Sequence, residues 1–400
     1  MKIKDVKVAT ISFPALSWNI NIVRVDTDEN VCGYGEAHCP KEHVLHLKNY
    51  IIGMNPLDVQ KILLKIQHRG GFKPWGSAVS AIEMALWDVA GKATGLPVYR
   101  LLGGKVRDRV RVYCDCGSGV QLDPKDPMSR YSPEAYVEKA RIRKALPEKF
   151  KILKFDIGFH GRQLLSVPGG SFEADESYPT KGHVTERGLK SEIAIVKALK
   201  EVLGDEVSLA LDCGPGQSLP SAISLARALE PFNVLWAEDL LSGDYTPYTE
   251  VQLYKILSSS TSTPILTGEQ IFLRYGFKDL IEENAVDIVA PDVCDVGGIA
   301  ELKWIAEFAD LHGVLIAPHN FGLPIAFMAN VHAAASMPKN FIAFEHHMVD
   351  VPWWRDLVKG LEDPLIQEGY VRVPEKPGLG IELDEANVRK HLVEGEKYFE

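Results

Sequence analysis

The sequence lacks long hydrophobic runs, a surplus of basic residues and a cysteine framework. Its apolar stretches fall far short of the roughly 20 residues that a membrane-spanning helix needs, and the charged N-terminus has no apolar signal core. Because 54 Asp and Glu outnumber 44 Lys and Arg, the formal net charge is −10, which disfavours a polyanionic partner. The six cysteines form neither a zinc-binding spacing nor a disulfide scaffold. We therefore expect a cytoplasmic protein with reduced thiols and no membrane or nucleic-acid partner.

What the chain has is the composition of an ordinary globular protein, with 46% hydrophobic and 24% charged residues. Its 400 residues are too many for one small core and predict either two domains or one large α/β barrel with additions. The first hundred residues favour an α+β arrangement. Residues 3–12, 20–25 and 31–36 are strand-like, and an apolar face recurs at helical spacing after Ser77.

From about residue 110 onward, short apolar runs alternate with amphipathic helical stretches. The eight runs are residues 110–114, 152–156, 207–212, 234–238, 265–269, 286–292, 314–319 and 341–345. Eight strands separated by helix-length segments predict a closed parallel barrel rather than an open sheet. No glycine-rich dinucleotide fingerprint opens any of these helices, so a dinucleotide-binding fold is not indicated.

Seven successive strands of the predicted barrel end in ionisable residues. They are Lys154 and Asp156 on one strand, then Asp212, Glu238, Glu269, Asp292, His319 and Glu345 on the following ones. All strands of such a barrel end on one face, where active sites lie. A single acid at a strand end is usually a helix cap or a solvated loop residue, but seven converging groups predict a functional site. Repulsion among so many carboxylates further predicts a bound cation.

Three of these acids end neighbouring strands and are the predicted metal ligands. Asp212, Glu238 and Glu269 offer only oxygen atoms, which favours a hard ion, Mg²⁺ first and Mn²⁺ as an alternative. A second possibility is that Asp239, next to Glu238, replaces one of the three as ligand.

His319 and Asp292 end adjacent strands beyond the predicted ligands. A carboxylate beside an imidazole fixes its tautomer and raises its basicity, so the pair predicts a general base. Lys154 would lie across the barrel, where its charge could neutralise a substrate carboxylate or an enolate oxygen. A solvated surface lysine is the plainer alternative.

Five motifs follow one another along the chain in a specific order. They are residues 80–93 with 95–104, then 236–239 (WAED), 267–270 (TGEQ), 291–298 (PDVCDVGG) and 317–320 (APHN). Together they resemble the enolase superfamily, in particular its mandelate racemase/muconate lactonizing enzyme branch. The resemblance covers almost the whole chain.

The resemblance implies an α/β fold, a modified TIM barrel of the (β/α)₇β type with an α+β capping domain. Residues 1–108 would form the capping domain, residues 109–360 the barrel, and residues 361–400 a C-terminal segment that returns to the capping domain. Capping loops near residues 15–19 and 38–44 would close over the substrate. The segment 159–187, which looks like an insertion, and the side chains Trp353 and Trp354 would add specificity.

The resemblance also implies a role for each residue at the strand ends. The residues that correspond to the Mg²⁺ ligands of the family are Asp212, Glu238 and Glu269. His319 with Asp292 corresponds to the catalytic dyad, and Glu345 to the acid that hydrogen-bonds the substrate carboxylate. Lys154 corresponds to the first lysine of the family's K-x-K motif.

Two positions depart from the pattern of the family. Asp156 stands where racemases of this branch have a second lysine, which disfavours two-base racemisation; it could be a weaker base, a partner for Lys154 or a ligand for a sugar hydroxyl. Gly214 stands where some sugar-acid dehydratases have a histidine, two residues after the first metal ligand.

The function expected from these features is a Mg²⁺-dependent sugar-acid dehydratase, a lyase that removes the proton beside the carboxylate and eliminates water to give a 2-keto-3-deoxy acid. An epimerase, racemase or cycloisomerase that uses the same enolate, and a non-catalytic sugar-acid binding protein, are the alternatives. The expected partner is a small sugar acid. By analogy with the family, we expect a homo-oligomer, either a dimer or an octamer.

Overall fold

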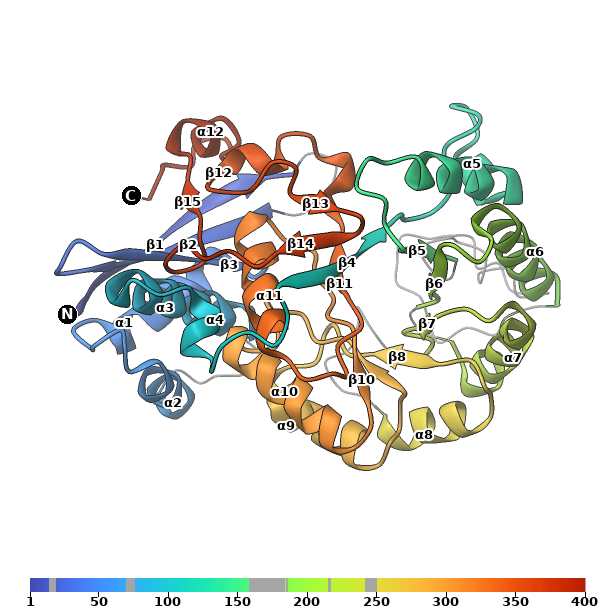
Figure 1. Cartoon of the computed structure of the whole chain (residues 1–400), viewed down its shortest axis with the longest axis horizontal. Coiled ribbons are helices and arrows are strands. Elements are labelled where there is room, and N and C mark those ends of the chain that lie inside the picture. The colour runs from blue at the N-terminus through green and yellow to red at the C-terminus, as the bar shows by residue number, and fades with distance from the viewer. Residues whose placement is uncertain are drawn as a thin grey trace.

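The first part of the chain forms a small antiparallel sheet with helices packed on it (Figure 1). The computed structural model describes residues 1–13, 19–69, 76–157, 184, 186–214, 217–241 and 250–399. The sheet has the strand order β1 (Ile3–Ser12), β2 (Asn19–Thr27), β3 (Cys32–Ala37). The helices are α1 (Lys41–Ile51), α2 (Val59–Arg69), α3 (Gly76–Thr94) and α4 (Val98–Leu101).

Helix α3 packs directly on β3 because two glycines of the strand leave room for the helix backbone. A Cβ atom at Gly35 would lie 1.8 Å from the carbonyl oxygen of Ala81, and one at Gly33 would lie 2.1 Å from that of Ala85. Any side chain at either position would therefore push the helix off the sheet.

The second part is a closed barrel of parallel strands. The strands are β4 (Arg109–Asp115), β5 (Ile152–Asp156), β6 (Ser208–Asp212), β7 (Ala237–Glu238), β8 (Ile265–Thr267), β9 (Ile288–Val289), β10 (Leu315–Ile316) and β11 (Phe344–His346). Strands β4 to β10 pair in chain order, and β11 pairs in parallel with β4. A parallel bridge between Ile316 and Phe341 joins β10 to the segment before β11 and completes the ring.

Helices connect the barrel strands and surround them on the outside (Figure 1). They are α5 (Pro133–Lys144), α6 (Glu186–Leu203), α7 (Leu219–Leu229), α8 (Val251–Ser259), α9 (Leu273–Glu282), α10 (Ile299–Leu311) and α11 (Pro324–Ser336). Short 3₁₀ turns are η1 (Pro127–Tyr131), η4 (Glu230–Phe232), η5 (Met348–Asp350) and η6 (Trp354–Leu357). One helix follows each strand from β4 to β10, so the predicted (β/α)₇β barrel with an α+β capping domain is confirmed.

Five strand ends differ from the prediction: β8, β9 and β10 end two or three residues early, and β4 and β11 end one residue late. The first barrel strand ends at Asp115, one residue later than predicted, so this strand also ends in an acid. The strand predicted over residues 286–292 is regular only as β9, and Asp292 lies in the loop that follows. The chain leaves the regular ladder early there and turns toward the barrel mouth.

The barrel interior below the mouth is filled by its own apolar cluster. The cluster consists of Tyr113, Ile152, Ala210, Trp236, Leu266, Ile288, Ala290, Ala317 and Ala343. Since these side chains come from successive strands and are buried, the barrel is a packed core rather than a pore. The ionisable residues at the carboxyl ends of the strands lie above this layer.

The C-terminal segment contacts both parts of the chain. Its elements are β12 (Val358–Lys359), β13 (Ile366–Gln367), β14 (Tyr370–Arg372), β15 (Glu382–Leu383) and α12 (Glu385–Lys390). Strand β14 first pairs antiparallel with β4 of the barrel. The chain then reaches β1, where the Val393 amide donates to the Thr10 carbonyl oxygen at 3.0 Å.

Carboxylates of the first part hold two barrel helices by their N-termini. The oxygens of Glu83, on α3, accept from the amides of Ile299 and Ala300 at the start of α10, at 2.7 and 2.9 Å. Glu36, on β3, likewise accepts from two amides at the start of α11, at 2.6 and 3.1 Å. Both carboxylates are fully buried. They satisfy helix N–H groups that would otherwise lack partners, and so fix the first part against the barrel.

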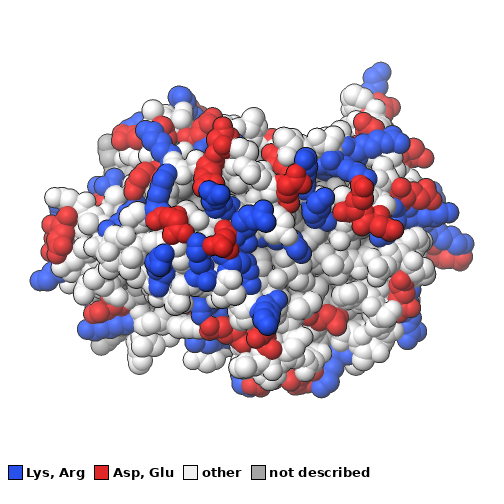
Figure 2. All heavy atoms as spheres, in the orientation of Figure 1, with Lys and Arg blue, Asp and Glu red and all other residues white. Residues whose placement is uncertain are grey.

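The remaining expectations about thiols and membranes can be compared directly with the structure. All six cysteines are free in the structure. Within the described ranges, no helix has the length and apolar character required to cross a bilayer. Acidic and basic side chains are mixed over the face shown in Figure 2, so the negative net charge forms no single-sign field there.

Candidate active site

A row of acids crosses three neighbouring barrel strands. In the parallel pairing, Asp156 on β5 is the register partner of Asp212 on β6, and Asp212 is the partner of Glu238 on β7. Residues in register lie on the same side of a sheet, so the three carboxylates line one height of the barrel wall.

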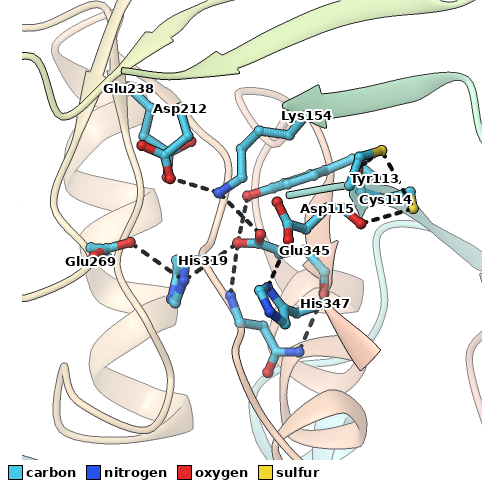
Figure 3. A network of polar contacts seen from close by, with 12 residues as sticks. Tyr113, Cys114, Asp115, Lys154, Asp212, Glu238, Glu269, His319, Glu345 and His347 are labelled. Atoms are coloured by element: carbon cyan, nitrogen blue, oxygen red, sulfur yellow. Dashed lines mark hydrogen bonds and ion pairs between the residues drawn. The ribbon is translucent and has the colours of Figure 1, made fainter. Parts of the chain in front are cut away.

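Glu269 approaches this row from the next strand. It follows β8 after Gly268, whose φ of +135° turns the chain sharply and favours glycine. A Cβ atom at Gly268 would lie 2.7 Å from the ring of Phe277. The turn therefore places Glu269 opposite His319, as Figure 3 shows.

The carboxylates form a cluster that fits a hard cation. Glu238, Asp239 and Glu269 each offer one ligand atom, and these atoms lie within 4.8 Å of one another. Figure 3 shows the carboxylate of Asp212 beside that of Glu238. All donors are carboxylate oxygens, the set that Mg²⁺ or Mn²⁺ prefers. The predicted ligands Asp212, Glu238 and Glu269 thus lie together, and so does Asp239, the alternative ligand.

Electrostatics within the cluster also favour a cation. Burial, together with the charges of Asp212 and Glu345, raises the pKa of Glu238 to about 7 against the opposing effect of Lys154. Like charges gathered in a buried site repel one another unless an opposite charge compensates them. A divalent ion among these oxygens would supply that charge.

Lys154 bridges the acid cluster and the last strand. Its Nζ atom lies 3.0 Å from Oε1 of Glu238 and 3.0 Å from Oε1 of Glu345. Burial alone would lower the pKa of the ammonium group, but the two carboxylates raise it well above its ordinary value. Lys154 is therefore a buried, charged residue inside the barrel and not a solvated surface lysine.

His319 and Asp292 form the predicted pair. Nδ1 of His319 lies 2.7 Å from Oδ2 of Asp292, whose Oδ1 accepts from the Cys294 amide at 2.6 Å. Nε2 of His319 consequently faces the mouth, 3.4 Å from Oε2 of Glu269. Burial would lower the pKa of the imidazole, but Glu345 and then Asp292 raise it to about 10. A base must be neutral to take a proton, so this carboxylate charge has to be compensated before His319 can act.

Glu345 is held by residues that the sequence did not single out. The Tyr113 hydroxyl donates to its Oε2 atom at 3.0 Å, and the Asn320 amide nitrogen lies 3.4 Å from the same atom. Tyr113 is the register partner of Glu345 across the junction of β4 and β11. Only the closure of the ring, which places the first strand beside the last, could have revealed this contact.

Asp115 and His347 also belong to the mouth and were missed as a pair. Nδ1 of His347 lies 2.9 Å from Oδ2 of Asp115. The sequence did contain a signal for this pair. Asp115 comes directly after the apolar run 110–114, and His347 lies two residues after Glu345. Reading the first strand one residue further would have extended the series of ionisable strand ends to Asp115.

The two departures from the family pattern have structural consequences. Asp156 ends β5 in register with Asp212, at the height of the acid row, and its role stays a prediction. At Gly214, a Cβ atom would lie 2.5 Å from the carbonyl oxygen of Asp239. No side chain fits at position 214, so the histidine found there in some dehydratases has no room in this backbone.

The residues predicted to set specificity are the two tryptophans, the two capping loops and segment 159–187. Trp354, predicted to add specificity, is a buried core residue whose indole donates to the Gly322 carbonyl oxygen at 2.9 Å. Trp353 stacks on His391 with ring centroids 3.9 Å apart. Residues 15–18 of the predicted capping loop 15–19, and almost all of segment 159–187, lie outside the described residues. From the other capping loop, His38 reaches the barrel, where its Nδ1 lies 3.9 Å from Oδ2 of Asp295.

Comparison with known families covers both parts of the chain. Residues 6–103 match the family model described as mandelate racemase/muconate lactonizing enzyme, N-terminal domain, and residues 137–387 match the model described as enolase C-terminal domain-like. The chain belongs to the mandelate racemase/muconate lactonizing enzyme family of the enolase superfamily. Enzymes of this superfamily use a divalent metal, and the acid cluster of this member offers a place for one.

Individual members of the family resemble the chain along its whole length. It is 36% identical to D-xylonate dehydratase of Haloferax volcanii, over 100% of this chain and 92% of that protein. It is 30% identical to D-galactonate dehydratase of Ralstonia nicotianae, over 92% and 89% of the two chains. The crystal structure of a mandelate racemase/muconate lactonizing enzyme-like protein from Rubrobacter xylanophilus matches with a TM-score of 0.84 and 33% identity, over 100% and 99%. The expectation of a dehydratase, and hence a lyase, is confirmed.

Proposed function

We propose that the protein is a Mg²⁺-dependent dehydratase of a sugar acid that forms a 2-keto-3-deoxy acid. The observation that carries the proposal is the position of the His319–Asp292 pair, in which Nε2 of the imidazole faces the cluster of buried carboxylates across the mouth. The relatives named as D-xylonate and D-galactonate dehydratases support a sugar acid as the substrate.

In this proposal the acid cluster holds the metal and the substrate carboxylate binds beside it. Asp212, Glu238 and Glu269 would be the ligands. When bound, the ion supplies the positive charge that makes a dianionic enolate tolerable. Lys154 adds a second positive charge at the same oxygens. Glu345, held by the Tyr113 hydroxyl, would hydrogen-bond the substrate carboxylate from the other side through a proton shared between the two groups.

His319 acts as the base. Asp292 accepts a hydrogen bond from Nδ1 and so leaves Nε2 as the atom that takes the proton from the carbon beside the carboxylate. The electron pair left on that carbon then forms a double bond to C3 as the C3 hydroxyl departs. The enol that remains becomes a 2-keto-3-deoxy acid.

A panel of aldonic and aldaric acids, beginning with D-xylonate and D-galactonate, tests the proposal with an assay for 2-keto acid. We expect product from at least one acid in the presence of Mg²⁺. His319→Asn keeps a polar side chain of similar size at this position but removes the base. This variant should lower the rate by at least about 10²-fold with an unchanged melting temperature. Absence of product from every acid would refute the dehydratase. Exchange of the C2 proton without loss of water would indicate the epimerase reaction instead.

A further inference from the structure

The first and last strands of the barrel hold a second imidazole–carboxylate pair at the mouth. Asp115 ends β4, and His347 comes directly after β11, so ring closure brings the two side chains together. The distance between His347 Nδ1 and Asp115 Oδ2 is 2.9 Å. The proposed reaction, as described above, gives this pair no role.

The geometry fixes which nitrogen of His347 can meet a ligand. Since Nδ1 faces Asp115, Nε2 is the atom left for the mouth, and 32% of the side chain is exposed. On another side the ring packs edge-on against Phe321, with centroids 4.2 Å apart. Burial would raise the pKa of Asp115, but His347 and then Lys154 hold it below its ordinary value. An ionised Asp115 accepts from Nδ1 and so orients the imidazole.

The neighbouring histidine has no such arrangement. His346 is buried between the rings of Phe327 and Trp354, at centroid distances of 5.3 and 5.2 Å. Burial, followed by the charge of His347, lowers its pKa to about 3. Of the two consecutive histidines, only His347 has both a carboxylate partner and access to the mouth.

The two imidazoles of the site border the same carboxylate from different strands. His319 Nε2 lies 3.6 Å from Oε2 of Glu345. His347, Asp115 and Glu345 have ligand atoms within 4.8 Å of one another (Figure 3). Such a group could also attract a second cation, but both of its carboxylates already have a partner: Asp115 is paired with His347 at 2.9 Å, and Glu345 with Lys154 at 3.0 Å. A proton donor therefore fits this position better than a metal ion.

We propose that His347, oriented by Asp115, is the acid that protonates the departing C3 hydroxyl group; this assignment rests on the proposed dehydratase function. His319 takes the C2 proton, and the electron pair from that bond forms the C2=C3 double bond as the C3–O bond breaks. The leaving oxygen takes a proton from Nε2 of His347 and departs as water. The enol then gains a proton at C3 and loses its O2 proton. Before the next turnover His319 releases a proton to solvent and His347 regains one.

A separate acid is needed when the C2 proton and the C3 hydroxyl leave from opposite faces of the substrate. A single imidazole can serve both steps only when the C2 proton and the C3 hydroxyl lie on the same face of the substrate. His319 and His347 come from different strands and can act on different faces. Gly214, beside the acid cluster, has no side chain that could serve instead.

A fluorinated substrate isolates the acid step, because fluoride leaves without needing a proton. With D-xylonate, His347→Gln is expected to lower the rate of water loss about 10²-fold, while exchange of the C2 proton with D₂O continues. With 3-deoxy-3-fluoro-D-xylonate, the same variant should release fluoride at close to the wild-type rate. His319→Asn should lose water elimination, exchange and fluoride release together.

Two further variants complete the experiment. His312→Gln is the matched control, since His312 lies at the C-terminal end of α10 and packs on Phe308 away from the mouth; it should behave as wild type. Asp115→Asn should reproduce the His347→Gln pattern in weaker form, with slower water loss and unimpaired fluoride release. A purely structural role for Asp115 would slow both reactions equally.

Three outcomes would overturn the assignment. If His347→Gln slows fluoride release as much as water loss, His347 binds substrate and does not donate the proton. Wild-type rates of water loss in this variant would exclude any role in the step. If the wild-type enzyme exchanges the C2 proton but eliminates neither water nor fluoride from any sugar acid tested, the proposed dehydratase function fails and the assignment of His347 fails with it.

Discussion

His346 and His347 show how far the environment decides what a residue does. They are adjacent in the sequence, yet His346 is enclosed by aromatic rings and His347 reaches Asp115 at the mouth. Burial disfavours the protonated imidazole of His346, and its pKa is lowered to about 3 from an ordinary value of 6.5. Histidine is thus a neutral core residue at position 346 and a candidate proton donor at position 347.

The depressed pKa of His346 predicts a dependence of stability on pH. Between pH 6.5 and about 3 the unfolded chain binds a proton at this residue that the folded chain does not, so stability falls as the pH falls through this window. His346→Phe keeps the ring packing and removes the titrating group. The loss of unfolding free energy between pH 7 and pH 5 should be smaller in the variant by about 2 kcal/mol.

Urea unfolding of the two proteins at both pH values would measure this difference. The buried His332, whose pKa burial lowers to about 4, contributes in the same direction in both proteins and therefore cancels in the comparison. Equal pH dependence of wild type and variant would contradict the assignment.

At the scale of elements, helix α3 is the part that joins the two halves of the chain. Its motif residues Ser80, Glu83 and Asp88 all accept hydrogen bonds from backbone amides of distant segments. Ser80 Oγ accepts from the Gly297 amide at 2.9 Å, and Asp88 accepts from the Leu379 amide at 2.8 Å. The motif in residues 80–93 is thus a docking surface of the helix, which positions the first part of the chain over the barrel.

Replacement of Glu83 should therefore weaken the contact between α3 and α10. Glu83→Ala removes the acceptor of two helix N–H groups and of the Trp87 indole, which lies 2.6 Å from Oε1. Each buried donor left without a partner costs about 1–3 kcal/mol, so we expect a clear drop in melting temperature. Glu138→Ala, an exposed helical position on α5, should change stability by less than about 0.5 kcal/mol. Similar melting temperatures for the two variants would show that the hydrogen bonds from α10 to Glu83 contribute little to stability.

At the scale of the whole molecule, the negative charge is divided between a mixed surface and a concentrated interior. The face in Figure 2 carries both signs side by side, whereas the mouth gathers several buried carboxylates around the ammonium group of Lys154. Repulsion inside the mouth is a cost to the folded protein that a bound divalent ion would relieve. Metal binding and global stability should therefore be coupled.

Addition of Mg²⁺ to metal-free protein should raise the melting temperature, by the equivalent of about 2.7 kcal/mol at 100 times the dissociation constant. Glu269→Gln, which removes one carboxylate of the cluster, should weaken this response, and EDTA should reverse it in the wild type. Thermal unfolding followed by circular dichroism would measure both. An equal response in Glu269→Gln would mean that the ion binds elsewhere.

Much of the fold follows from local patterns in the sequence. Apolar runs with β-branched residues predicted the barrel strands, because burial on both faces selects such runs for parallel sheets. The exact ends were less predictable, as β9 and Asp115 show, since strand ends depend on where the barrel pairing stops. The convergence of Asp212, Glu238 and Glu269 was predictable for a topological reason, because parallel strands all end on one face.

By itself, the sequence determined the strands, the shared face on which they end and the ionisable residues placed there. These features follow from the spacing of apolar residues and from the order of the elements, which can be read along the chain. The tertiary structure alone decided which of these residues meet. The contacts of Asp115 with His347 and of Tyr113 with Glu345 join positions 232 residues apart, and they exist only because ring closure places the first strand beside the last. Likewise, only the packed backbone shows that position 214 has no room for a side chain. Contacts across a closed barrel depend on three-dimensional register, which no local pattern in the chain encodes.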